Sequence, residues 1–255
     1  MENKRESILK GIISLLISQV FIKIIGLIYK LYLTNREGFG DSGNAIYSSG
    51  SQIYALLLTF SSTGVPNAIS YLVSERLAVG DNKGAHKIFK IAFVTFALIG
   101  IMGSLLLFAG AETISNKWIQ IPEAKYSLMA LSPSIFFVSI TSVIRGYFNG
   151  RQSFSVTAKS QTIEQIFKTV FTVSLVELVV ILGKQNTEIM AASANMATTV
   201  ATVSSFIYIF IYYRTKRKEI GQEIFETVNY KPTRIRKTLR KIINVAIPIS
   251  ISSLI

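Results

Sequence analysis

The chain has 255 residues, of which 50% are hydrophobic and only 16% are charged, and its mean hydropathy is +0.45. A soluble domain normally carries about 25% charged residues, so this composition excludes an ordinary soluble domain and favours a membrane protein with several crossings. The net charge of +13 does not indicate nucleic-acid binding, because the basic residues lie between apolar runs and form no nucleic-acid motif.

The residue types needed for metal binding or catalysis are sparse. There is no cysteine, and the single histidine, His86, lies in a predicted loop beside Lys83 and Lys87. Zinc sites usually use several nitrogen or sulfur ligands, so we expect no metal site and no cofactor. No pair of carboxylates suits acid–base catalysis, and we therefore expect no enzyme activity.

The first apolar run, residues 8–35, is longer than the roughly 20 residues that a helix needs to cross a bilayer. Helical spacing places four polar or small residues on one of its faces: Gln19, Lys23, Gly26 and Lys30. A charge inside the bilayer is costly, so this face is expected to line a water-filled cavity. Lys30 lies near the end of the run and could instead extend its ammonium group to the lipid headgroups.

The second run, residues 42–74, carries no charge and contains a second polar stripe that includes Gln52. This stripe is expected either to line the same cavity or to pack against another helix. Pro66, which follows Gly64, should kink or break the helix.

Four more runs are predicted to cross the membrane: residues 91–111, 126–144, 163–183 and 189–213. Glu164 and Lys168 are spaced as a local i,i+4 pair near the start of the third of these runs. Glu177 lies further in and is a candidate for the cavity, for a proton or cation site, or for a contact between helices.

The distribution of basic residues predicts the topology. With a cytoplasmic N-terminus, twenty of the 27 basic residues fall in cytoplasmic segments and four in outer ones, as the positive-inside rule requires. The expected organisation is a six-helix lobe (1–213), a basic cytoplasmic linker (214–241) and the start of a seventh helix (242–255). Because the seventh run is too short to cross a bilayer, the chain is expected to be the front half of a longer protein.

Two segments resemble a known family. Residues 54–76, followed by 85–90, and residues 142–152, with the Arg-Gly-Tyr-Phe-Asn-Gly run starting at Arg145, are similar to stage V sporulation protein B-type polysaccharide exporters. This family sits with the lipid II flippases in the multidrug, oligosaccharidyl-lipid and polysaccharide (MOP) exporter superfamily. The resemblance implies an all-α, polytopic transmembrane helix bundle that forms the N-terminal lobe of a two-lobe transporter in the bacterial cell membrane.

The resemblance also implies a function. The cargo would be a polyprenyl-diphosphate-linked sugar such as lipid II, moved from the inner to the outer leaflet by alternating access. Related flippases hold the diphosphate with basic residues of the first helices, a role that Lys23 and Lys30 match, with Arg36 at the outer mouth. The family more often has arginine at such positions, and lysine lacks its bidentate fork. Gln19 and Gln52 would complete the cavity.

Some alternatives stay open at this stage. The Arg145-Gly146 pair is expected to form a gate or hinge at a cytoplasmic helix end, in preference to binding lipid, because glycine permits positive φ and Arg145 could cap the preceding carbonyls. A cation-coupled multidrug exporter of the same superfamily is the main functional alternative, with Glu177 as the coupling residue. A membrane enzyme acting on lipid-linked sugars is less favoured. The sugar and any coupling cation are left unassigned.

Overall fold

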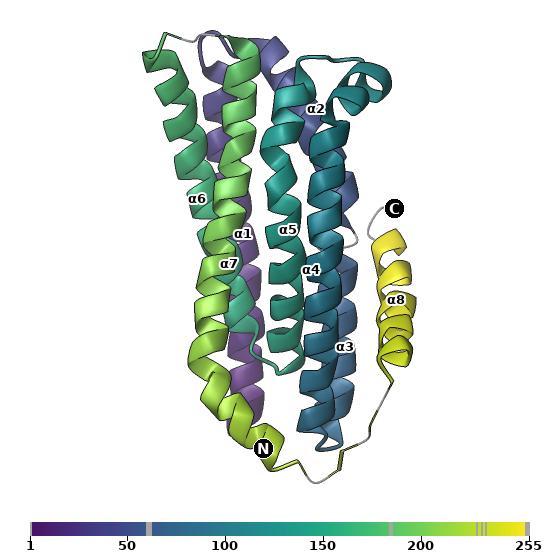
Figure 1. Ribbon diagram of the computed structural model, residues 1–255. Helices are drawn as coiled ribbons and strands as arrows, with labels where there is room; N and C mark the ends of the chain where they lie inside the picture. The colour runs from purple at the N-terminus through teal and green to yellow at the C-terminus, as the bar shows by residue number, and fades with distance from the viewer. Residues whose placement is uncertain are drawn as a thin grey trace.

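The computed structural model describes residues 2–59, 63–183, 186–227, 229, 230, 232 and 234–252, with side chains described from Leu9 onward. These residues form helices and no strand, arranged lengthwise in one bundle (Figure 1). The elements are α1 (Glu2–Asn35), α2 (Gly40–Thr59), α3 (Val65–Ala78), α4 (Asn82–Thr113), the π-helical turn η2 (Ile114–Ile119), α5 (Ala124–Gly150), α6 (Phe154–Ile181), α7 (Thr187–Phe225) and α8 (Ile235–Ser252). The all-α prediction is confirmed.

Within the described residues, four helical segments are long and apolar enough to cross a membrane: Leu9–Asn35, Asn82–Ile119, Ala124–Gly150 and Thr187–Phe225. The α2 and α6 helices, which the sequence also predicts to cross, lie lengthwise in the same bundle. They are not among these four segments because they are more polar. The apolar run of α6, for example, contains three charged residues, Glu164, Lys168 and Glu177. The protein is a multi-pass membrane protein in which the more polar helices pack among apolar ones.

The structure confirms one predicted helix boundary and corrects others. The run from 42 to 74 is broken into α2 and α3, as expected from Pro66, which lies in the first turn of α3. The α6 helix begins at Phe154, nine residues earlier than predicted. The predicted linker is mostly helical, because α7 continues to Phe225 and α8 already begins at Ile235. His86 lies within α4 and not in a loop.

Turns between helices are stabilised by local polar contacts. Between α3 and α4, Gly80 adopts a positive φ of 76°, and Asp81 caps α4 by accepting a hydrogen bond of 2.7 Å from the Gly84 amide. The same carboxylate pairs with Arg76 at 2.8 Å, at the end of α3. One aspartate therefore joins the end of one helix to the beginning of the next.

Small residues allow the helices to approach closely. A Cβ atom on Gly146 of α5 would lie 2.7 Å from the carbonyl oxygen of Pro66, and one on Gly150 would lie 2.7 Å from that of Ser70. On the other side of α3, a Cβ on Gly64 would lie 2.6 Å from the carbonyl oxygen of Ala246 in α8. Close backbone contact of this kind is typical of helix packing in membranes.

The turn expected at Arg145-Gly146 is not observed, because α5 runs unbroken through both residues to Gly150. Positive φ values among the described glycines occur at Gly38, Gly40, Gly80 and Gly183, and not at Gly146. Gly146 instead contacts Pro66 across the α3–α5 interface. Its lack of a side chain serves helix packing and not a turn.

Replacing Gly146 tests this interface. We expect Gly146→Ala to destabilise the purified protein by about 1–3 kcal/mol, because the added methyl group must push α5 away from the backbone of α3. Thermal unfolding in detergent measures the change. Gly110→Ala in α4 is the control, since its methyl group would make only an ordinary contact at 3.6 Å with Ile114. Equal melting temperatures for both variants would contradict the proposed packing role.

Candidate functional site

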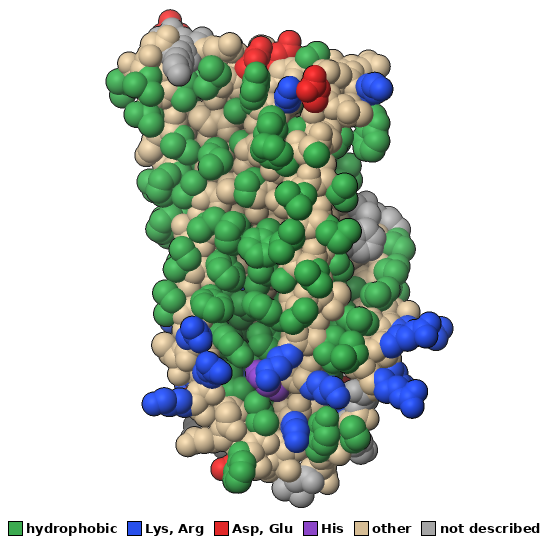
Figure 2. All heavy atoms as spheres, in the orientation of Figure 1, with side chains coloured by type: hydrophobic (Ala, Val, Ile, Leu, Met, Phe, Trp, Pro, Cys, Tyr) green, Lys and Arg blue, Asp and Glu red, His purple; other side chains and the backbone are tan. Residues whose placement is uncertain are grey.

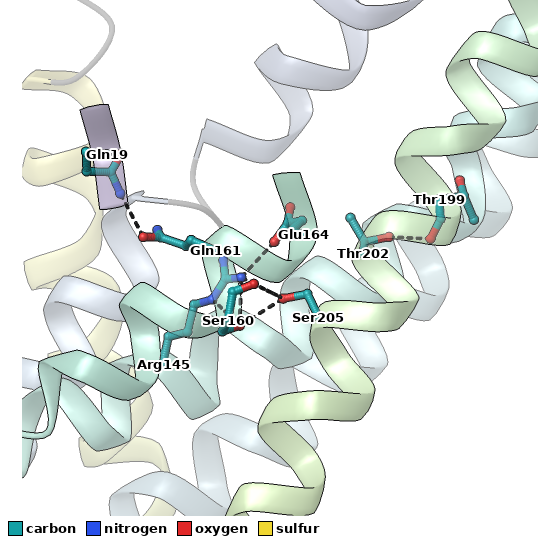
Figure 3. A network of polar contacts seen from close by, with 8 residues as sticks. All are labelled: Gln19, Arg145, Ser160, Gln161, Glu164, Thr199, Thr202 and Ser205. Carbon is teal, nitrogen blue, oxygen red and sulfur yellow. Dashed lines mark hydrogen bonds and ion pairs between the residues drawn. The ribbon is translucent and has the colours of Figure 1, made fainter. Parts of the chain in front are cut away.

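Arg145 is the centre of a polar cluster inside the bundle (Figure 3). From α5, its guanidinium forms an ion pair of 2.7 Å with Glu164 of α6. The same group donates hydrogen bonds of 2.9 Å to Ser160 Oγ of α6 and 2.7 Å to Ser205 Oγ of α7. The two serine hydroxyls lie 2.8 Å apart and are fully buried. One arginine thus joins three helices, and it does not cap the carbonyls of its own helix as expected.

The sequence of α6 explains how this cluster forms. Ser160, Glu164 and Lys168 follow one another at intervals of four residues, so they lie on one face of the helix. The facing part of α7 is rich in alanine, serine and threonine, which lets it approach closely enough for Ser205 to reach the cluster. Glu164 therefore pairs with Arg145 across helices, and the predicted local pair with Lys168 is wrong.

A cavity of about 270 Å³ adjoins the cluster. Its lining comes from α1, α2, α5, α6 and α7, namely Gln19, Ile22, Tyr54, Leu58, Val138, Ser142, Arg145, Gln161, Glu164, Gln165, Lys168, Thr198 and Ala201. Gln19 donates a hydrogen bond of 2.7 Å to the side-chain oxygen of Gln161, which ties α1 to α6 at the cavity wall (Figure 3). The cavity can therefore offer charged and amide groups to a polar ligand.

Lys168 is the cation in this cavity that has no acidic partner. It lies fourteen residues from the start of α6, about 21 Å along the helix axis. Its Nζ lies 5.3 Å from the centre of the Tyr29 ring, and Tyr47 and Tyr54 are close enough to interact with it electrostatically. Among the described residues, no carboxylate forms an ion pair with it. A neutral aromatic ring attracts the ammonium group without neutralising its charge.

The predicted ligands on α1 do not share one environment. The buried face of α1 is centred on Ser18, Ile22 and Tyr29, so Gln19 lies at its border. Lys23 and Lys30 lie beyond that border and are exposed. Because an α-helix has 3.6 residues per turn, the residues of one stripe are still rotated by some tens of degrees relative to one another about the helix axis. This rotation is enough to place Gln19 at the edge of the buried face and both lysines outside it.

Gln52 of α2 is also exposed and does not line the cavity. Its helix contributes Tyr54 and Leu58 instead. The structure therefore brings Gln19 together with Arg145, and leaves Lys23, Lys30 and Gln52 on the outer surface of this bundle.

Arg36 and Glu177, predicted as a substrate ligand and as a candidate coupling residue, are paired with each other. Arg36 Nε lies 2.8 Å from the Glu177 carboxylate, and Tyr32 donates a hydrogen bond to the same group. The hydrogen bond to Glu177 raises the pKa of Arg36. Glu177 lies four residues before the end of α6, so of the three roles left open for it, the contact between helices is the one observed.

Lys168 is the residue that sequence reasoning missed. Its position was interpreted as near the membrane surface because α6 was expected to begin at residue 163. The turn signal that could have corrected this is Gly150-Arg-Gln-Ser153, directly before the observed start at Phe154. Counting from there places Lys168 deep in the bundle.

Three relatives from Bacillus subtilis (strain 168) are similar to this chain. Stage V sporulation protein B is 24% identical over 96% of the chain, lipid II flippase MurJ is 26% identical over 83%, and the uncharacterized membrane protein YabM is 27% identical over 99%. The matches cover 46%, 40% and 45% of these relatives, so the chain spans less than half of their length.

Solved structures show the same fold. A MOP superfamily transporter from Pyrococcus furiosus matches with a TM-score of 0.73 at 16% identity, over 96% of this chain and 52% of that one. An outward-facing multidrug resistance MATE transporter of the MOP superfamily matches with a TM-score of 0.79 at 16% identity, over 97% of this chain and 52% of that one. The bundle thus has the MOP fold.

The sequence model of one family matches almost the whole chain. That family is described as "Polysaccharide biosynthesis protein", and the match covers residues 8–255. Together with the MOP fold and the apolar helices, this match shows that the chain belongs to the polysaccharide biosynthesis protein family of membrane proteins.

Proposed function

We propose that this chain is the N-terminal lobe of a transporter that moves a polyprenyl-diphosphate-linked cell-wall precursor, lipid II or a lipid-linked oligosaccharide, from the inner to the outer leaflet. The observation that carries this proposal is Lys168, a cation in a polar cavity of a membrane protein that pairs with no carboxylate in the described part of the chain. A charge in such a place is costly, and charges found inside membrane proteins typically mark a substrate or ion pathway. The name of one relative, lipid II flippase MurJ, agrees with such a cargo.

The charges of the cavity support an anionic cargo. Arg145 and Lys168 are positive and Glu164 is negative, which leaves an excess of one positive charge among these three. Because Glu164 is paired with Arg145, and Glu177 with Arg36, neither carboxylate is free to hold a coupling cation or a cationic drug. This arrangement favours the flippase over the multidrug exporter.

The exposed cations of α1 belong to the same proposal. In transporters built from two lobes, the substrate path runs between the lobes. Lys23 and Lys30 lie on the exposed side of α1 and Gln52 on the exposed side of α2, where they would face a second lobe across such a path. Exposure of a lysine in the middle of a membrane-crossing helix is expected when water, and not lipid, lies beside it.

The proposed orientation places the basic end of the bundle in the cytoplasm. Figure 2 shows a broad hydrophobic band on one face, with Lys and Arg side chains gathered below it. The N-terminus lies at this lower end (Figure 1). Both features support a cytoplasmic N-terminus by the positive-inside rule.

Substitution of Lys168 tests the cavity. In vesicles that contain the full-length protein, we expect Lys168→Met to lower outward movement of lipid II about 10-fold or more, because a charge-assisted contact worth about 1.5–3 kcal/mol is lost while the aliphatic stem remains. Lys168→Arg should retain part of the activity. Lys159→Met, on an exposed position of the same helix, is the control. Wild-type rates for Lys168→Met at equal protein levels would refute the role of this cavity.

A separate experiment tests the lysines of α1. Lys23→Ala should abolish transport in the same vesicles, whereas Lys23→Arg should largely preserve it, since only the positive charge is needed to hold a diphosphate. Leu27→Ala serves as the control, because Leu27 is also exposed on α1 but is uncharged. Unchanged transport by the Lys23→Ala protein would show that Lys23 does not contact the substrate. The role of the Lys168 cavity would then depend only on the Lys168 variants.

A further inference from the structure

A second polar hollow lies between α4 and α7 at the basic end of the bundle. It has a volume of about 270 Å³ and is separate from the Lys168 cavity. Its lining is His86 and Lys90 of α4 with Phe210, Tyr213, Arg214, Arg217, Ile220, Gly221 and Ile224 of α7. We call it the α4–α7 groove. The residues from α7 recur at helical spacing, so one face of that helix forms one wall.

The groove carries positive charge that the protein does not neutralise. Its lining includes Lys90, Arg214 and Arg217 and no carboxylate. In the described part of the chain, none of these three forms an ion pair. The nearby carboxylates of α7 are already engaged, Glu219 with Lys216 at 2.6 Å and Glu223 with Arg151 at 2.7 Å. An anion entering the groove would therefore meet three cations without displacing an existing partner.

The groove lies at the level where lipid headgroups are expected. Tyr208, Tyr212 and Tyr213 lie in the last two turns of α7 before Arg214, and such aromatic residues mark the membrane–water interface. On the bilayer side of the groove, apolar side chains are exposed on both helices, including Val94 of α4 and Ile207 and Ile211 of α7. A ligand with an anionic head and apolar tails would match both regions.

We propose that the α4–α7 groove binds the headgroup of an anionic phospholipid. Lys90, Arg214 and Arg217 contact the phosphate, while the acyl chains lie along the exposed apolar surface of α4 and α7. Basic pockets between transmembrane helices on the cytoplasmic side are suited to such headgroups. Arg214 is oriented by Phe210, whose ring centre lies 5.5 Å from its guanidinium carbon. The site does not depend on which cargo the protein transports.

Two kinds of variant test this site in different ways. Arg214→Gln with Arg217→Gln removes two charges, whereas Gly221→Trp fills the groove and keeps them. The second change should be tolerated by the fold, because a Cβ on Gly221 meets no atom within 4 Å. Lys218→Gln is the matched control, since Lys218 neighbours Arg217, is exposed and does not line the groove.

Binding is measured on the full-length protein by native mass spectrometry, with phosphatidylglycerol as the probe and phosphatidylcholine as the neutral comparison. We expect the double variant to bind phosphatidylglycerol about 25-fold more weakly, since each basic residue near the surface contributes about fivefold. Gly221→Trp should reduce binding at least as much, Lys218→Gln should match the wild type, and phosphatidylcholine binding should not change.

Three outcomes would overturn the proposal. The first is wild-type phosphatidylglycerol binding by both groove variants. The second is equal loss for Lys218→Gln, which would indicate a general surface charge effect. The third is complete displacement of the lipid by soluble glycerol phosphate at equal concentration, which would mean that the site binds a free phosphate ester without use of the acyl chains. Melting temperatures of all variants in phosphatidylcholine verify that each one is folded.

Discussion

The ion pair between Arg145 and Glu164 is the interaction on which the rest of the bundle depends. A guanidinium group inside a membrane protein is tolerated only when its charge and its hydrogen bonds are satisfied. Here Glu164, Ser160 and Ser205 supply those partners from two other helices. Removing one partner of such a pair typically costs about 3–5 kcal/mol, so the relative positions of α5, α6 and α7 are strongly constrained.

Close backbone packing makes this polar cluster possible. Gly146 follows Arg145 directly and lets α5 lie against Pro66 of α3, which points the arginine away from α3 and toward α6 and α7. Neighbouring residues, about 100° apart around the helix axis, thus serve two different faces of one helix, one in packing and one in charge pairing. This division explains why an arginine and a glycine stand next to each other in α5.

The pairing of carboxylates with cations distinguishes two regions of the protein, the interior cavity and the basic end. In the interior, Arg145 is neutralised and Lys168 is left as the available cation beside three tyrosines. At the basic end, Lys90, Arg214 and Arg217 form no ion pair within the described residues, and the neighbouring glutamates of α7 are paired elsewhere. In both places, the carboxylates that are already paired determine which cations can bind an external anion. The two cavities have about the same volume.

The sequence by itself determined the membrane class, the helical fold, the break near Pro66 and the family, because hydropathy, proline chemistry and short motifs act locally along the chain. Only the tertiary structure decided that Glu164 pairs with Arg145, that Glu177 pairs with Arg36, and that Gln19 faces inward while Lys23 faces outward. These outcomes depend on how far each helix is rotated about its axis and on which helix lies beside it. Helical periodicity defines a stripe of residues, but the neighbouring helices decide which edge of that stripe is buried.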